Sequence, residues 1–240
     1  MTYKAVLFDL GSTLIEYENH EWAELGKMGI KAAHPYLKGL FPDLSPVEIF
    51  GPSFYKHLRD ILDSRAGEAE VGLYDAVSEI FQRMKIVYRD GLVEKFVDIY
   101  YKPVTDQISL IPGAVEVLQA ISDSNKVIGL VSNSIFPEKF HLGEMKRFGL
   151  HKYFDFTIFS SSVGFRKPGR RIFDLALKRA GVSPSEAIFI GDRFDADIAG
   201  AKNAGMTSIW RHRAGRENPD TIEPDYSIDN LTDLLPIVLK

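Results

Sequence analysis

The sequence predicts an α/β protein whose doubly wound, parallel-sheet, Rossmann-like core is interrupted by an inserted α-helical cap domain. The first observation is a set of short apolar runs, rich in Val, Ile and Phe, with the length of buried strands. These runs occupy residues 3–8, 126–131, 154–159, 186–190 and 206–210. The second observation is a series of helical patterns between the later runs. The third is a long, purely helical stretch after the first run.

Helical patterns separate the later apolar runs. Residues 113–121 follow Pro112, a residue type that often opens a helix, and carry apolar side chains on one stripe. Residues 168–180 show similar apolar spacing, and residues 183–186 (SPSE) have the pattern of a capping box with proline at the first helical position. Because strand and helix alternate, the later part of the chain predicts parallel βαβ units.

The helical insert is expected at residues 17–101, so that residues 1–16 and 102–240 form the core. Its apolar residues recur at helical spacing, and most of its aromatic residues are interpreted as the core of a helix bundle. A pocket role is considered for six insert residues, although bundle core or surface is preferred for each. They are His20, Trp22, His34, Phe54, Tyr55 and His57. An insert at this position can cover the carboxyl end of the sheet, where α/β proteins bind ligands.

Composition excludes several classes of protein. The chain has 29 Lys and Arg against 33 Asp and Glu, a net charge of −4, which argues against a broad basic surface for nucleic acid. It has no cysteine, so disulfides, thiolate metal sites and a cysteine nucleophile are excluded. Its apolar runs are too short for a signal peptide or a membrane span. A cytoplasmic protein with no nucleic-acid or membrane partner is expected, with no prediction of its oligomeric state.

Four polar clusters follow apolar runs or precede a helix, and strand ends are where α/β folds place their chemistry. They are FDLGSTL at 8–14, LVSNS at 130–134, GFRKP at 164–168 and IGDRFDAD at 190–197. Each alone is typical of a turn, a helix cap or a solvated surface. Together they supply a carboxylate nucleophile, a hydroxyl, a lysine and an acidic pair. That combination favours phosphoryl transfer assisted by Mg²⁺.

In this order, the motifs resemble those of the haloacid dehalogenase superfamily. The resemblance runs through FDLGSTL, LVSNS, RKP and GDRFDAD followed by IAGAKNAGM, and it covers essentially the whole chain. The position of the insert is similar to that of the family's type-1 cap, which lies over the site and shapes substrate choice. The resemblance therefore implies a hydrolase of this superfamily, most similar to its phosphatase branch.

The resemblance also implies a metal site. Asp9 would be the nucleophile and a metal ligand, the backbone carbonyl of Gly11 a second ligand, and Asp192 the last protein contact to Mg²⁺. Asp197, which ends the GDxxxxD pattern, would support the metal shell, and Asp195 is left as a helix-cap residue.

Substrate contacts follow from the same resemblance. Ser132 and the backbone of Asn133 would hold the phosphoryl oxygens. Lys167 would neutralise these oxygens and restrain Asp9, and Thr13 would help to position the first loop. Ser132 and Lys167 are therefore counted with Asp9 as catalytic.

One position departs from the family pattern. The phosphatases usually have a second Asp two residues after the nucleophile as general acid and base, and here that position is Gly11. General acid–base help contributes about 10²–10⁴-fold to rate, so a slower enzyme or another proton donor is expected. Glu16, Glu18 and His20 are the nearest candidates, although exposed charges are the preferred interpretation for each.

The function predicted is a Mg²⁺-dependent phosphatase that hydrolyses a small phosphorylated metabolite through an aspartyl-phosphate on Asp9. A 2-haloacid dehalogenase-like hydrolase and a non-catalytic phosphate-binding protein on the same fold remain alternatives. Two further groups of residues are interpreted as lying outside the site. His141, His151 and His212 are expected to be surface or packing residues, and the basic residues Arg211, Arg213 and Arg216 are expected in a solvated loop.

Overall fold

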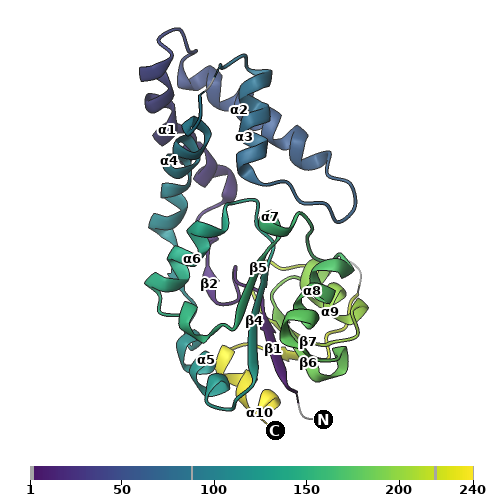
Figure 1. Cartoon of the computed structure of the whole chain (residues 1–240). Coiled ribbons are helices and arrows are strands. Elements are labelled where there is room, and N and C mark those ends of the chain that lie inside the picture. Colours follow the sequence, from purple (N-terminus) through teal and green to yellow (C-terminus); the bar gives the residue numbers. More distant parts are fainter. Residues whose placement is uncertain (1–2, 88, 219–220, 240) are drawn as a thin grey trace.

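The computed structural model describes residues 3–87, 89–218 and 221–239, and it confirms an α/β core with a helical insert (Figure 1). The core contains a six-stranded parallel sheet with the order β5-β4-β1-β6-β7-β8. Its strands are β1 (Ala5–Phe8), β4 (Val127–Ser132), β5 (Phe156–Phe159), β6 (Ala187–Gly191), β7 (Thr207–Arg211) and β8 (Tyr226–Ile228). The first five match the predicted apolar runs, whereas β8 was not predicted.

Strand β1 lies at the centre of the sheet, where the direction of winding changes. After β1 the chain builds β4 and β5 on one side, then crosses to β6, β7 and β8 on the other. Phe8 pairs in register with Leu130 of β4 and Ile190 of β6, so these three strands end at the same edge. Ligands of doubly wound sheets bind outside the carboxyl ends at such a switch point.

Both faces of the sheet are buried, as expected for parallel strands covered by helices. Val6 and Phe8 belong to one apolar cluster, whereas Ala5 and Leu7 of the same strand belong to the other. Helices α5 (Ala114–Ser122), α6 (Glu138–Arg147) and α10 (Leu235–Val238) lie on one side of the sheet, and α8 (Arg170–Ala180) and α9 (Ala199–Asn203) on the other (Figure 1).

Short turns complete the core. They are α7 (Ser160–Val163), the 3₁₀ turns η1 (His151–Tyr153), η2 (Pro184–Glu186) and η4 (Leu231–Leu234), and the π-helical turn η3 (Phe194–Ile198). The predicted capping box forms between Ser183 and Glu186, but it caps only the single 3₁₀ turn η2 before β6. The chain then continues directly as β6, in agreement with the apolar run predicted at residues 186–190.

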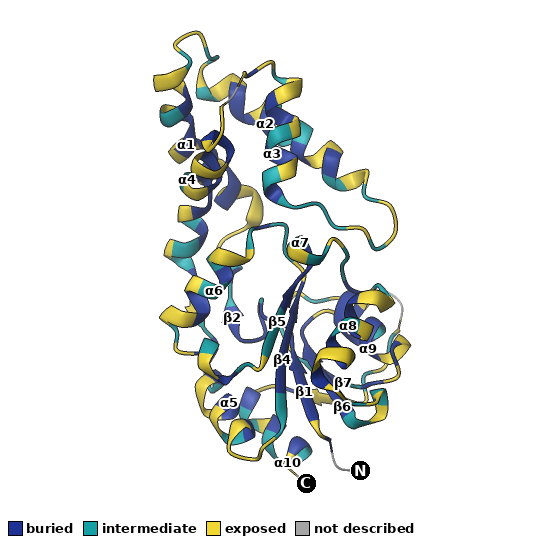
Figure 2. Cartoon of the chain, viewed as in Figure 1, coloured by how far each residue is buried: buried dark blue, intermediate teal, exposed yellow. Residues whose placement is uncertain are grey.

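The described residues of the insert form four helices, α1 (Trp22–Leu40), α2 (Val47–Asp63), α3 (Leu73–Arg83) and α4 (Leu92–Gln107). Their buried faces turn toward one another and their outer faces are exposed (Figure 2). A short antiparallel pair, β2 (Ile15–Glu16) and β3 (Ser109–Leu110), stands where the chain leaves and re-enters the core. Helix α4 continues beyond residue 101, and the division at residues 16 and 101 stays a prediction.

Helices α1 and α4 approach closely at Gly29. A Cβ atom built there would lie 2.5 Å from the carbonyl oxygen of Tyr100, closer than real Cβ contacts come. Glycine is thus required for this helix crossing. In the described part of the chain, every helix is too short or too polar to cross a membrane.

Candidate active site

A cavity of about 610 Å³ lies between the insert and the carboxyl edge of the sheet. It gathers seven of the predicted site residues, which are Asp9, Gly11, Ser132, Asn133, Lys167, Asp192 and Asp197. The eighth, Thr13, is buried behind the cavity, and its hydroxyl donates to Oδ2 of Asp9 over 3.4 Å. Asp195 is an exposed residue that forms an ion pair with Arg193 at 2.7 Å.

Lys167 lies at the centre of the site. Its Nζ atom is 2.7 Å from Oδ1 of Asp9, 2.7 Å from Oδ1 of Asp197 and 2.8 Å from the carbonyl oxygen of Val131. Its side chain is 2% exposed. Burial lowers the pKa of Lys167, but the charges of Asp197 and Asp9 outweigh this effect and raise the pKa above its usual value. Lys167 is therefore a cation in the folded protein.

Asn133 fixes the loop that presents Lys167. Its side-chain Nδ2 donates to the carbonyl oxygen of Lys167 over 2.9 Å, and its Oδ1 accepts from the backbone N–H of Lys167 over 2.8 Å. These two bonds join the end of β4 to the turn before α8. The side chain of Asn133 thus has a positioning role, separate from the backbone role predicted for it.

Asp9, Asp192 and Asp197 form a buried carboxylate cluster, in which one oxygen from each lies within 4.8 Å of the others. The glycine at the end of β6 makes this possible. A Cβ atom on Gly191 would lie 2.3 Å from Cγ of Asp197. The π-helical turn η3 completes the arrangement, because Oδ2 of Asp197 accepts from the backbone N–H of Arg193 over 3.0 Å.

This cluster suits a hard divalent cation. Burial and the charges of Asp197 and Asp9 raise the pKa of Asp192 to about 7, which shows how unfavourable three crowded carboxylates are. All of the donor atoms are oxygens, the ligands that Mg²⁺ prefers. Lys167 is shared by Asp9 and Asp197, and Arg216 pairs with Asp192, so two cations face the three carboxylates and one negative charge is left for a metal ion to offset. The residues present therefore fit Mg²⁺ held by one or two carboxylates.

The basic loop after β7 reaches the site, contrary to the sequence prediction of a solvated loop. Nε of Arg216 is 2.5 Å from Oδ2 of Asp192, and its Nη2 is 2.9 Å from Oε1 of Glu18. Arg213 forms ion pairs with Glu16 at 3.1 Å and with Glu18 at 2.9 Å. The prediction was wrong because these pairs join segments that are far apart in the sequence.

Other cavity residues were not assigned to the site from the sequence. Trp22 and Tyr55, interpreted as insert core or surface, line the cavity on the insert side. Ser134 and His141 line it on the core side, although His141 was interpreted as a surface or packing residue. The only sequence signal for Ser134 was its place in the LVSNS motif.

Comparisons with known proteins identify the family of the chain. A family model described as haloacid dehalogenase-like hydrolase matches residues 3–205. The glyceraldehyde 3-phosphate phosphatase of Methanopyrus kandleri is 30% identical over 241 residues, which covers 98% of this chain and 97% of that protein. The pyrimidine 5'-nucleotidase YjjG of Escherichia coli is 36% identical over 131 residues, which covers 54% of this chain but only 57% of that protein.

A solved structure shows the same architecture. The crystal structure of a HAD phosphatase from Thermococcus onnurineus superposes with a TM-score of 0.67 at 26% identity, covering 98% of this chain and 97% of that one. The shared fold, the family model and the full-length similarity point to one conclusion. The chain belongs to the family of haloacid dehalogenase-like hydrolases.

Proposed function

We propose that the protein is a Mg²⁺-dependent phosphatase that hydrolyses a small phosphorylated metabolite through an aspartyl-phosphate on Asp9. The observation that carries the proposal is the position of Lys167 between Asp9 and Asp197 in a buried carboxylate cluster. The phosphatase names of the relatives from Methanopyrus kandleri and Thermococcus onnurineus support it. The cavity of about 610 Å³ has the size of a small-molecule site.

In the first step, the Asp9 carboxylate attacks phosphorus and the bond to the leaving oxygen breaks. Lys167 and Thr13 hold the carboxylate from two directions, which reduces the entropy lost on reaching the reactive geometry. The hydroxyl of Ser132 and the backbone N–H of Asn133 bind the phosphoryl oxygens. In the second step, water attacks phosphorus and the bond to Asp9 breaks, which releases phosphate and restores the carboxylate.

The metal would be held by Asp9, the backbone carbonyl of Gly11 and Asp192, with Asp197 supporting the shell. When bound, Mg²⁺ supplies positive charge that offsets the charge of the phosphoryl oxygens. Before the metal binds, Arg216 is a neighbouring cation for Asp192. The chain has no cysteine, which is compatible with a reducing compartment, and we propose that the reaction takes place in the cytoplasm.

The carboxylate cluster also separates this proposal from its alternatives. A dehalogenase acts on a halocarboxylate, and Asp192 and Asp197 would place repelling charge near that anion. A purely binding protein would need phosphate affinity but no nucleophile, whereas here Asp9 has Lys167 and Thr13 in hydrogen-bond contact.

Hydrolysis of an aryl phosphate tests the proposal, because an aryl leaving group needs little protonation. We expect turnover by the purified protein with Mg²⁺, and none with a chelator or in Asp9→Asn. Chloride release from 2-chloropropionate is measured beside it. Dehalogenation without phosphate release would favour the alternative enzyme, and binding of phosphate without either activity would favour the binding protein.

A further inference from the structure

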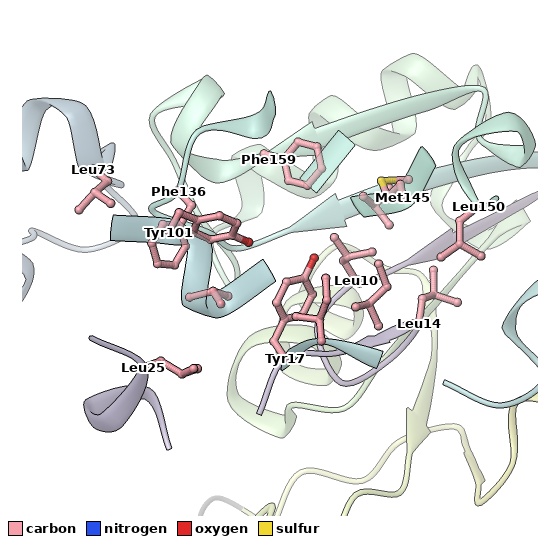
Figure 3. Close-up of a cluster of buried hydrophobic side chains, with 14 of the residues drawn as sticks. Leu10, Leu14, Tyr17, Leu25, Leu73, Tyr101, Phe136, Met145, Leu150 and Phe159 are labelled. Atoms are coloured by element: carbon pink, nitrogen blue, oxygen red, sulfur yellow. The ribbon is translucent and has the colours of Figure 1, made fainter. Parts of the chain in front are cut away.

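A cluster of buried polar groups lies beside the cavity, between α6, α4 and the segment after β2. At its centre is Glu144 of α6, whose side chain is 3% exposed. Its Oε2 accepts from the hydroxyl of Tyr17 over 2.6 Å, and its Oε1 accepts from Tyr101 over 2.9 Å and from Thr105 over 3.3 Å. Figure 3 shows Tyr17 and Tyr101 within the surrounding apolar cluster. A buried carboxylate requires such donors.

His141 connects this carboxylate to the cavity. Its Nδ1 is 3.2 Å from Oε2 of Glu144, and its Nε2 is 2.7 Å from Oγ of Ser134. The hydroxyl of Tyr17 is also 3.2 Å from Nδ1. In the tautomer with a proton on Nδ1, that nitrogen donates to Glu144 and the other ring nitrogen faces Ser134. Nε2 is thus the ring nitrogen placed to exchange a proton with the hydroxyl of Ser134. This is the arrangement by which a carboxylate orients a catalytic histidine.

Glu144 is the charged group in direct contact with His141. Among the residues that the structure describes, His141 is the only ion-pair partner of Glu144. Arg147, also on α6, donates a hydrogen bond from Nη1 to the carbonyl oxygen of Thr105 over 3.1 Å. Burial and the charges of Tyr101 and Glu144 raise the pKa of Tyr17 well above its usual value, so Tyr17 stays a neutral donor. His141 is the imidazole of this cluster, and imidazole is the side chain that most often serves as a general acid or base.

The hydroxyl of Ser134 can transfer a proton between His141 and the cavity. Its hydroxyl oxygen accepts from the backbone N–H of Phe136 over 3.1 Å and faces Nε2 of His141. A hydroxyl has two lone pairs and one hydrogen. When Nε2 of His141 donates to the second lone pair, the hydrogen of the Ser134 hydroxyl is left to be donated into the cavity that Ser134 shares with Asp9.

The same cluster borders the position of the missing carboxylate. A Cβ atom built on Gly11 would have Tyr17 Cδ2 as its nearest neighbour, at an ordinary contact distance of 3.7 Å. The ring of Tyr17, whose hydroxyl bonds Glu144, therefore packs beside the place where the second Asp of related phosphatases would stand. The polar cluster around Glu144 therefore lies next to Gly11, where the second Asp is missing.

We propose that Ser134 and His141 supply the proton transfer that Gly11 cannot, with Glu144 as the residue that positions His141. As the bond between phosphorus and the leaving oxygen breaks, Ser134 donates its proton to that oxygen and takes one from Nε2 of His141. As water then attacks the aspartyl-phosphate, its proton returns through Ser134 to Nε2. Ser134 is the catalytic residue of this relay, which rests on the proposed phosphatase function.

The dependence on leaving group tests the relay. We compare kcat/KM for an alkyl phosphate, whose leaving oxygen needs a proton, with kcat/KM for an aryl phosphate. This parameter reports the steps up to release of the alcohol. In His141→Gln, the alkyl value is expected to fall about 10²–10⁴-fold while the aryl value changes little. The matched control His151→Gln lies on η1, away from the cavity residues, and should leave both values unchanged.

Two further variants make the test independent of any folding defect. Ser134→Ala should lower the alkyl-to-aryl ratio in the same way. Adding Gly11→Asp to His141→Gln should restore alkyl turnover, since a Cβ atom at Gly11 meets its nearest neighbour at an ordinary contact distance. An equal loss on both substrates, or no rescue in a folded double variant, would overturn the relay. A wild-type protein inactive on aryl phosphate would instead contradict the phosphatase function itself.

Discussion

Replacing Lys167 with Met removes the cation that two buried carboxylates share, while most of the side-chain volume is kept. Asp9 and Asp197 would then remain buried, 10% and 1% exposed, without their common partner. Removing one partner of a buried ion pair costs about 3–5 kcal/mol of unfolding free energy. For a chain of this size, 1 kcal/mol shifts Tm by about 2–4 °C, so Tm should fall by roughly 6–20 °C.

The assay is thermal and urea unfolding of Lys167→Met beside Lys202→Met. Lys202 is 3.3 Å from Asp225, but its side chain is 40% exposed, and such pairs contribute about 0–1 kcal/mol. Adding Mg²⁺ should recover part of the loss in Lys167→Met, because the remaining cluster is more negative. If Lys167→Met were as stable as the control, the buried lysine would not compensate the carboxylates and the electrostatic reasoning would fail.

Three other predictions concern the insert, the core surface and the metal site. Gly29→Ala should lower the free energy of unfolding by about 1–3 kcal/mol, because the new methyl group would clash with the backbone of α4. The control Gly39→Ala has open space around its new methyl group and should cause no such loss. Urea unfolding of the two variants measures the difference. Lys4 and Ser183 lower the pKa of Glu186 from 4.5 to about 2, so its contribution to stability is present above pH 4.5 and lost as pH falls toward 2. The stability difference between wild type and Glu186→Gln should therefore shrink between pH 6 and pH 3, and a constant difference would argue against it. Mg²⁺ at a hundred times its Kd should raise the unfolding free energy by about 2.7 kcal/mol, and Asp192→Asn should remove this gain in calorimetry.

The strands could be predicted where burial is complete. All five residues of β6 are buried, so the strand reads as an uninterrupted apolar run. Strand β8 was missed because it lies at the sheet edge, where Tyr226 and Ser227 are exposed and only Ile228 is buried. The cap of η2 was recognised, but local capping signals do not determine how many turns follow.

The site could be predicted where its residues belong to motifs at strand ends, because the carboxyl ends of parallel strands meet at one edge. The contacts of Arg216 and His141 could not be predicted in this way. Arg216 reaches Asp192 from a loop with no motif, and His141 reaches Ser134 and Glu144 through the packing of α6. Their partners are determined by tertiary packing, and the periodicity of the sequence gives no information about such contacts.

The central claim is that phosphate is transferred to Asp9. Acid quenching of the enzyme during turnover of an aryl phosphate, followed by peptide mapping, measures this directly. We expect a phosphoryl group on Asp9 in the wild type from the earliest times, and none in Asp9→Asn. Turnover at full rate with Asp9 unmodified throughout, or with the phosphoryl group on another residue, would contradict the account.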